Sequence, residues 1–99
     1  MKIKLARSEV IHFVGIGGIG MSGLALVMKG MGFKVQGSDI NLNKNIERLK
    51  KDKIKVFIGH EKKNISQATI IVISSAVKKN NIEVVLAKKR KLPIYKRGD

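Results

Sequence analysis

Three glycines in the spacing Gly-x-Gly-x-x-Gly, at Gly15, Gly17 and Gly20, form the pattern in this sequence that most clearly indicates chemistry. They follow the β-favouring run 11–14, in which only His12 is polar, and precede a segment with helical periodicity. This is the strand, turn and helix arrangement that cradles a diphosphate. The backbone N–H groups of residues 18–21 would lie unpaired at the start of that helix and favour an anion. The sequence therefore predicts a phosphate site here; a merely flexible turn is the alternative.

Each glycine of this turn has its own expected task. Gly15 allows the chain to turn sharply off the strand, because it tolerates backbone angles that other residues avoid. Gly17 allows the backbone to approach a ligand without an intervening Cβ, and Gly20 allows the helix to pack close to the sheet. Gly18 adds further freedom to the turn.

Asp39 is the second residue whose position indicates a ligand. It lies nineteen positions beyond Gly20, after the short strand pattern 33–37 and next to Ser38. In dinucleotide-binding folds, an acid about this far beyond the glycine turn accepts hydrogen bonds from ribose hydroxyls. Asp39 could instead form an Asx turn or cap a helix.

Two further strand ends carry polar or small residues. His60 follows the strand pattern 54–58, and Ser74, Ser75 and Ala76 follow the continuously apolar run 70–73. A surface histidine and a plain strand-end turn are the alternatives for these positions. We expect them at the site because the carboxyl ends of parallel strands share one edge of a sheet.

The elements that must position these residues alternate along the chain. Strand patterns at 10–15, 33–37, 54–58, 70–73 and 94–96 are separated by helical patterns at 19–30, 43–51, 64–67 and 80–91. This alternation and right-handed crossovers predict an α/β fold, a Rossmann-like doubly wound parallel sheet of five strands in the order 3-2-1-4-5, with helices on both faces.

The helices have recognisable faces and ends. Leu24, Val27, Met28 and Met31 are expected to face the sheet from the first helix, which Gly30 and Gly32 end. Asn41 or Asn43 is expected to cap the second helix, which buries Ile46 and Leu49. Asn80 is expected to cap the third, with Glu83 three residues further on.

Composition limits the classes of protein that fit. A chain of 99 residues forms a single domain, and the absence of cysteine excludes disulfides and thiolate metal sites and suits the cytoplasm. The net charge of +14 would suit a nucleic acid. However, the lysine clusters are expected at opposite edges of the sheet, and only 4% of residues are aromatic, so we expect no specific nucleic-acid partner. Glycines interrupt the apolar run 10–28, so we expect no membrane span.

Beyond these patterns, the sequence resembles the Mur ligase family of peptidoglycan synthesis, in particular the ligases that join L-alanine to UDP-N-acetylmuramate. The segment 12–25 is similar to their opening signature, and the Met-Ser pair after the glycines makes the match specific. Segments 37–39, 58–60 and 74–77 follow in the family's order, as do Pro93 and Arg97. Two departures are visible: Ile82 stands where the family usually has proline, and Lys53 stands where the family commonly has glycine.

The resemblance implies that residues 1–99 are the first domain of such a ligase and hold the UDP part of UDP-N-acetylmuramate. The full enzyme would use ATP and Mg²⁺ to make an acyl phosphate that the amine of L-alanine attacks, supporting cell-wall synthesis and, through it, cell shape and division. The family's Gly-Lys ATP loop has no counterpart here, because the sequence contains no Gly-Lys pair. We therefore expect the ATP-binding and C-terminal domains to lie outside this chain, and the 99 residues alone to be inactive, with no catalytic residue, metal or cofactor of their own.

The resemblance also implies roles for individual residues. The glycine turn would face the diphosphate, Ser38 and Asp39 the uridine, and the remaining residues the same pocket. The expected UDP-binding residues are Gly15, Gly17, Gly18, Ile19, Gly20, Met21, Ser22, Ser38, Asp39, His60, Ser74, Ser75 and Ala76.

Three other readings remain open on the sequence. An NAD(P)-binding Rossmann module, enzymatic or regulatory, would use the glycine turn and Asp39 equally well. A nucleic-acid-binding domain is favoured by net charge alone. The related ligase that attaches a whole peptide is the third, although its glycine turn usually departs from this pattern.

Overall fold

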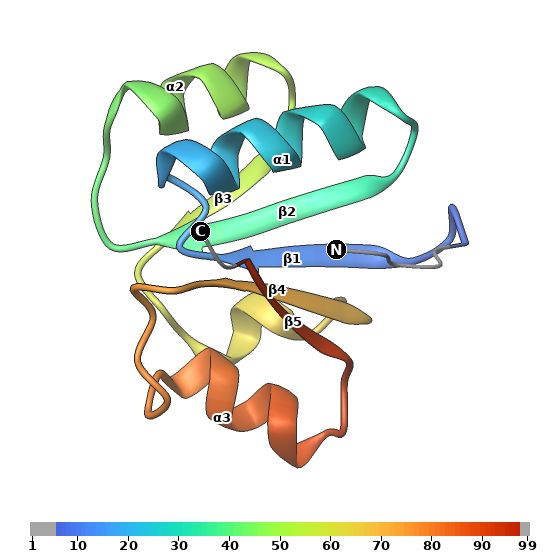
Figure 1. The fold of residues 1–99 in the computed structure, drawn as a ribbon, viewed down its shortest axis with the longest axis vertical. Helices are drawn as coiled ribbons and strands as arrows, with labels where there is room; N and C mark the ends of the chain where they lie inside the picture. Colours follow the sequence, from blue (N-terminus) through green and yellow to red (C-terminus); the bar gives the residue numbers. More distant parts are fainter. Residues whose placement is uncertain (1–5, 98–99) are drawn as a thin grey trace.

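A computed structural model describes residues 6–97 of the chain as one parallel sheet flanked by helices (Figure 1). The strands lie in the order β3-β2-β1-β4-β5, and every neighbouring pair is parallel, which confirms the predicted fold class. The elements along the chain are β1 (Val10–Val14), α1 (Ile19–Gly30), β2 (Lys34–Asp39), α2 (Lys44–Lys51), β3 (Lys55–Ile58), the 3₁₀ turn η1 (Lys62–Ile65), β4 (Ile70–Ser74), α3 (Ile82–Lys89) and β5 (Ile94–Arg97).

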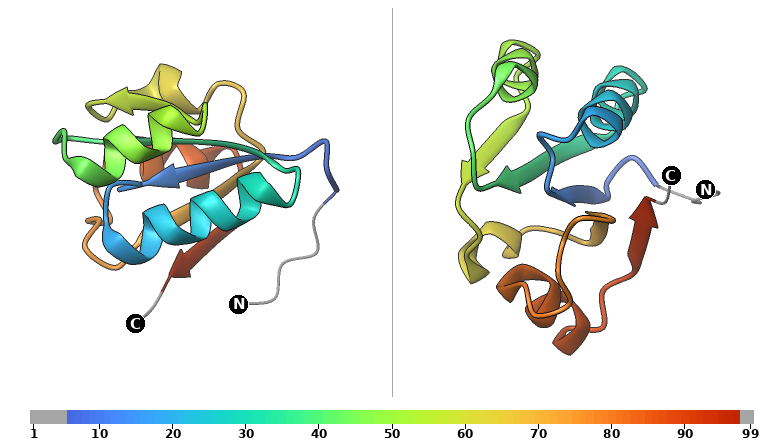
Figure 2. Two further views of the ribbon diagram at one scale, coloured as in Figure 1. Left: turned by 90° about the horizontal axis from the view of Figure 1, so that it is seen from above. Right: turned by 60° about the vertical axis from the view of Figure 1, so that its left-hand side comes forward.

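The helices form a layer on each face of the sheet. Helices α1 and α2 cover one face, whereas α3 and η1 cover the other (Figures 1 and 2). Side chains of β1 alternate between the two layers: Ile11 and Phe13 belong to the core under α1 and α2, and Val14 belongs to the core under α3. His12 therefore also points toward α3, and it is fully buried.

Helix α1 has the predicted bounds but a different buried face. Met21, Ala25 and Met28 are buried, whereas Val27 and Met31 are 59% and 53% exposed. Residues three, four and seven positions apart share one side of a helix, so Met28 aligns with Met21 and Ala25 and not with Val27. Met31 lies past the helical residues as the C-cap. The predicted face was thus wrong at Val27 and Met31, while Leu24 is partly buried against the core.

The caps of the other helices differ from the prediction at one position. Asn43 caps α2, because its side chain accepts a hydrogen bond from Ile46 N at 2.9 Å. Asn81, not Asn80, caps α3, accepting from Glu83 N at 2.9 Å. The prediction placed this cap one residue early because two asparagines are adjacent in the sequence.

Two positions beyond the end of each α-helix lies a residue with a left-handed backbone. Gly32, Lys53 and Lys91 have φ angles of +93°, +61° and +57°. In each case the next residue donates its backbone N–H to a carbonyl five positions earlier, the Schellman arrangement. This conformation explains why glycine suits position 53.

Gly37 in β2 has no space for a side chain. A Cβ added there would lie 2.5 Å from Ile16 Cδ1 and 2.7 Å from the carbonyl oxygen of Phe13. The turn after β1 folds directly over this position of β2. Glycine at position 37 therefore lets the glycine turn sit against the sheet.

The remaining connection is short, as predicted. A single 3₁₀ turn at 62–65 links β3 to β4, close to the helical turn expected at 64–67. Within residues 6–97, no helix is long and apolar enough to cross a membrane.

Candidate functional site

A cleft of about 440 Å³ lies at the carboxyl ends of the strands, where the topology predicts a site. We call it the main cleft. It is lined by Gly15, Gly18, Asp39, Ile40, Asn41, His60, Ser74, Ala76, Val77, Lys78, Asn80 and Asn81.

A smaller space of about 100 Å³, the side hollow, shares Gly18 and Ser74 with the main cleft. It continues along the start of α1 toward the end of β5. Its lining consists of Gly18, Ile19, Gly20, Met21, Ser74, Ser75 and Arg97.

The turn between the two spaces is held by the backbone. Gly15 has a φ of +83°, and both its N–H and that of Ile16 donate to the carbonyl of Ser38, at 2.9 and 3.0 Å. The N–H of Gly18 donates to Gly15 O at 3.3 Å, so it is occupied rather than free as the sequence had suggested. Within the described part of the chain, the N–H groups of residues 19–21 have no acceptor. These three donors lie in the first turn of α1, and the start of a helix favours an anion.

Arg97 adds a positive charge beside these donors. Its guanidinium lies so close to Gly20 that a Cβ there would be 2.9 Å from Nε and 3.0 Å from Nη2. The Nε atom is buried and lacks a hydrogen-bond partner among residues 6–97. Gly20 therefore makes room for this side chain, whereas we had expected it to serve the packing of helix on sheet. The sequence indicated Arg97 only through the resemblance to the family, and it predicted no role for this side chain.

Asp39 makes hydrogen bonds within the turn and also reaches the main cleft. Its Oδ2 accepts from Gly17 N at 2.8 Å, and its Oδ1 accepts from Ile40 N at 2.8 Å and Asn41 N at 3.3 Å. The carboxylate thus forms an Asx turn and also lines the main cleft. A carboxylate has about four acceptor positions, so one remains for a ligand hydroxyl.

Gly17 lies against the protein rather than against the cleft. A Cβ at this position would meet Asp39 Oδ2 at 2.8 Å, Ile46 Cδ1 at 3.0 Å and Asn43 Nδ2 at 3.1 Å. Its carbonyl accepts from Asn43 and Asn45. The missing side chain thus allows the turn to pack on β2 and α2, and this close packing was not foreseen from the sequence.

A buried polar network lies beneath the main cleft, and its centre is Glu83. This carboxylate is fully buried and is hydrogen-bonded by five groups. Burial alone would raise the pKa of Glu83, but the hydrogen bond and the charge of His12, followed by the hydrogen bonds of Asn64 and Ser38, lower the pKa to about 2. The donors are His12 Nε2 (2.7 Å), Ser38 Oγ (2.7 Å), Asn64 Nδ2 (2.8 Å), Glu61 N (3.1 Å) and His60 Nδ1 (3.3 Å).

Sequence reasoning missed most of this network. It took Glu83 as part of a helix start and His12 as the polar member of a strand. The strand register explains the network, because β1 and β2 align His12 with Gln36 and Val14 with Ser38, so the polar members share the face covered by α3. A polar residue in an otherwise apolar central strand was the available signal.

The residues predicted to bind the ligand fall into two groups. Most line the main cleft or the side hollow. Gly17, Ser22 and Ser38 line neither. Ser22 is buried and its hydroxyl donates to Ile19 O at 3.1 Å, whereas Ser38 belongs to the polar network. The residues that line one or both spaces are Gly15, Gly18, Ile19, Gly20, Met21, Asp39, His60, Ser74, Ser75 and Ala76.

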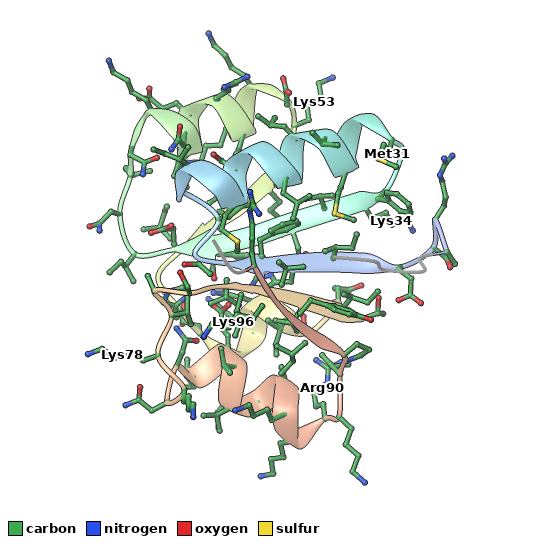
Figure 3. All side chains as sticks on the ribbon, in the orientation of Figure 1. Met31, Lys34, Lys53, Lys78, Arg90 and Lys96 are labelled. Atoms are coloured by element: carbon green, nitrogen blue, oxygen red, sulfur yellow. The ribbon has the colours of Figure 1, made fainter. Side chains whose placement is uncertain are left out.

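Basic side chains occur at both ends of the strands. Lys78 lies at the end that holds the main cleft, whereas Lys34 and Arg90 lie at the opposite end (Figure 3). Among the described residues, no group of three or more His, Cys, Asp or Glu could hold a metal ion.

Comparison with known families and structures identifies the relatives of this chain. The profile described as "Mur ligase family, catalytic domain" matches residues 10–99. The UDP-N-acetylmuramate–L-alanine ligase of Pelagibacter ubique is 73% identical over 99 residues, covering all of this chain and 21% of the relative. The chain spans about a fifth of the length of the curated relatives it matches.

Solved structures agree with the sequence relatives. The UDP-N-acetylmuramate–alanine ligase of Thermotoga maritima has a TM-score of 0.85 and 39% identity, over 89% of this chain and 20% of that one. A UDP-N-acetylmuramate:L-alanyl-γ-D-glutamyl-meso-diaminopimelate ligase from Neisseria meningitides has a TM-score of 0.82 and 30% identity, over 89% of this chain and 28% of that one. The matched profile covers most of the chain, and the chain therefore belongs to the Mur ligase family.

Proposed function

We propose that this chain is the UDP-binding domain of an ATP-dependent ligase that adds L-alanine to UDP-N-acetylmuramate in the cytoplasm during peptidoglycan synthesis. The remaining domains would act in cis and supply the ATP and Mg²⁺ site, because the 99 residues contain no Gly-Lys turn. The names of the relatives, at up to 73% identity, support this substrate.

The observation that carries the proposal is that the two ends of the site differ in chemistry. At one end, three free N–H groups at residues 19–21 and the guanidinium of Arg97 favour a diphosphate. At the other end, Asp39 lines the main cleft with acceptor capacity for a ribose or base donor. A nucleoside diphosphate would span both ends, with its phosphates over the glycine turn.

Two alternatives share this fold. An NAD(P)-binding module would use the same glycine turn and acid, so only ligand preference separates it from the proposal. The peptide-attaching ligase is also similar in structure, but L-alanine ligases are the more similar relatives in sequence.

Thermal unfolding in the presence of UDP-N-acetylmuramate or NAD tests the proposal. At a UDP-sugar concentration a hundred times the dissociation constant, the stability gain should be about 2.7 kcal/mol, or several degrees for a domain of this size. NAD at the same concentration should protect less. Equal or greater protection by NAD would support a dinucleotide module instead.

Arg97→Gln should lower the affinity for the UDP-sugar at least tenfold, because it removes a charge-assisted hydrogen bond to phosphate. Lys96→Gln is the matched control: it changes the charge equally on the same strand, and Lys96 is exposed and lines neither space. Equal effects of the two substitutions would indicate a general attraction to positive charge rather than a phosphate contact.

A further inference from the structure

The polar network beneath the main cleft fixes where its protons lie. Gln36 Nε2 donates to Asn64 O at 2.8 Å and also lies 2.8 Å from His12 Nδ1. The amide nitrogen must face the carbonyl of Asn64, so His12 Nδ1 is the acceptor of the second amide proton. In its neutral form, His12 then carries its proton on Nε2, which it donates to Glu83.

The hydrogen-bond partners of His60 likewise determine which of its ring nitrogens carries the proton. Ser38 has one hydroxyl proton and donates it to Glu83 Oε1 at 2.7 Å. Its oxygen is therefore free to accept from His60 Nδ1, which lies 3.0 Å away. Glu83 Oε2 lies 3.3 Å from the same nitrogen and can only accept, since the carboxylate is ionised. Both neighbours thus require a proton on Nδ1 of His60.

The second nitrogen of His60 is left for the cleft. The two ring nitrogens of imidazole point in nearly opposite directions, and Nδ1 points into the network. The His60 side chain is 18% exposed and lines the main cleft. In the neutral ring, Nε2 is then a hydrogen-bond acceptor facing that space.

We propose that Glu83 is a positioning residue which, with Ser38, holds His60 in the Nδ1–H tautomer, so that Nε2 accepts a hydrogen bond from the nucleoside half of the bound nucleotide. The donor would be a ribose hydroxyl or a base N–H. This inference rests on the proposed function, and it assigns a role to a residue that does not itself touch the ligand.

The charges around His60 agree with a nucleoside rather than a phosphate neighbour. Asp39 lines the same cleft as a carboxylate, and ionised phosphate oxygens offer acceptors only, which a neutral Nε2 cannot satisfy. Glu61 follows His60, but its side chain is 57% exposed and lies 3.8 Å from Lys63. Lys78 also lines the cleft and remains available to an anionic group. The diphosphate therefore has its better partners at the start of α1.

Glu83→Gln tests the positioning role because it keeps the shape and changes one acceptor into a donor. The nitrogen of the new amide would present hydrogens to groups that now donate to the carboxylate. His60 should respond by moving its proton to Nε2, which lets Nδ1 accept from the amide. Glu61→Gln, the same change on an exposed neighbour, is the matched control.

Nitrogen NMR of the imidazole rings reads the tautomers directly. The sequence contains only two histidines, so each signal is assigned by one substitution. In the parent chain at pH 8 we expect His60 with its proton on Nδ1 and His12 with its proton on Nε2. Glu83→Gln should shift His60 toward the Nε2–H form, and Glu61→Gln should not. His60 as the Nε2–H tautomer in the parent chain would overturn the inference, and this result does not require that Glu83→Gln folds.

Ligand selectivity tests the cleft-facing acceptor. Two analogues each lack one hydrogen-bond donor of the nucleoside: 2′-deoxy-UDP lacks a ribose hydroxyl, and N3-methyl-UDP lacks the base N–H. By titration calorimetry at pH 8, the parent chain should bind UDP about tenfold more tightly than the analogue that lacks the donor to His60. Glu83→Gln and His60→Phe should lose this preference, and Glu61→Gln should keep it. Affinity for inorganic pyrophosphate should be the same in all four proteins.

The outcomes separate this inference from the proposed function. Failure of UDP to bind the parent chain would contradict the proposed function, while the tautomer measurement would still decide the positioning role. Binding of UDP with no preference over either analogue, or an equal loss of pyrophosphate affinity in Glu83→Gln, would overturn the inference and leave the function standing.

Discussion

Glu83 is the residue whose ionisation should dominate the acid sensitivity of this fold. Its folded pKa of about 2 is below its ordinary value of 4.5, so the carboxylate stabilises the fold above pH 4.5 and loses that contribution as the pH falls toward 2. The shift corresponds to about 3 kcal/mol in total. Because the side chain is fully buried, solvent screens little of it.

Urea unfolding at pH 5 and pH 2.5 checks this contribution. Between these values, the free energy of unfolding of the parent chain should fall about 2 kcal/mol more than that of Glu83→Gln, which is less stable at pH 5 but lacks the titrating group. Glu61→Gln, on an exposed neighbour, should follow the parent chain. If the free energy of unfolding falls equally in the parent chain and in Glu83→Gln between pH 5 and pH 2.5, other carboxylates cause the acid sensitivity.

Spacing in the sequence predicts the positions of some residues in the candidate site and misses others for a physical reason. Gly15 and Asp39 were predictable, because a turn between strand and helix and an acid at the next strand end are local patterns. Glu83 was not, since its role depends on where α3 crosses β1 and β2. Its position three residues after Asn80 also matched a helix start, which hid the buried carboxylate.

At the scale of elements, the ends of α2 and α3 contain backbone strain that glycine would relieve. Lys53 and Lys91 have left-handed backbones, which cost a residue with a Cβ about 1 kcal/mol. Lys53→Gly and Lys91→Gly should therefore each raise the free energy of unfolding by about 1 kcal/mol. Lys50→Gly, the same change within α2, should lower it by about 1 kcal/mol. Urea denaturation measures all three, and a loss of stability at position 53 would refute this account.

Gly37 and Gly23 form a matched pair that tests the packing of the glycine turn on β2. A Cβ at Gly37 would overlap Ile16 and the backbone of Phe13, whereas one at Gly23 in α1 would meet nothing within 4 Å. Gly37→Ala should lower the free energy of unfolding by about 1 to 3 kcal/mol, and Gly23→Ala should raise it by up to about 1 kcal/mol. Thermal unfolding compares the two; similar effects would mean that the turn does not pack closely.

The elements themselves were largely predictable, but their faces and ends were less so. The apolar run of β4 and the glycines around α1 define those elements locally. The buried face of α1 also depends on which side meets the sheet. Several apolar residues surround that helix, so Val27 was wrongly assigned to the core.

For the whole molecule, the strand order followed from the sequence because few topologies are compatible with it. Alternating strands and helices with right-handed crossovers leave the order β3-β2-β1-β4-β5 as the expected one, and that order places the site at the carboxyl edge. The positive charge is likewise spread over both ends of the sheet rather than gathered at the site (Figure 3). Fold and charge together agree with a small phosphate-bearing ligand better than with a long polyanion.

The central claim, that UDP binds across the main cleft and the side hollow, is tested most directly by amide NMR of the nitrogen-labelled chain during titration with UDP. We predict the largest shifts at residues 19–21, with further shifts at Asp39 and His60. The N–H groups of Lys34 and Arg90, at the opposite end of the strands, should not move. Saturable shifts confined to that opposite end, or no saturable shift at residues 19–21, would contradict the account.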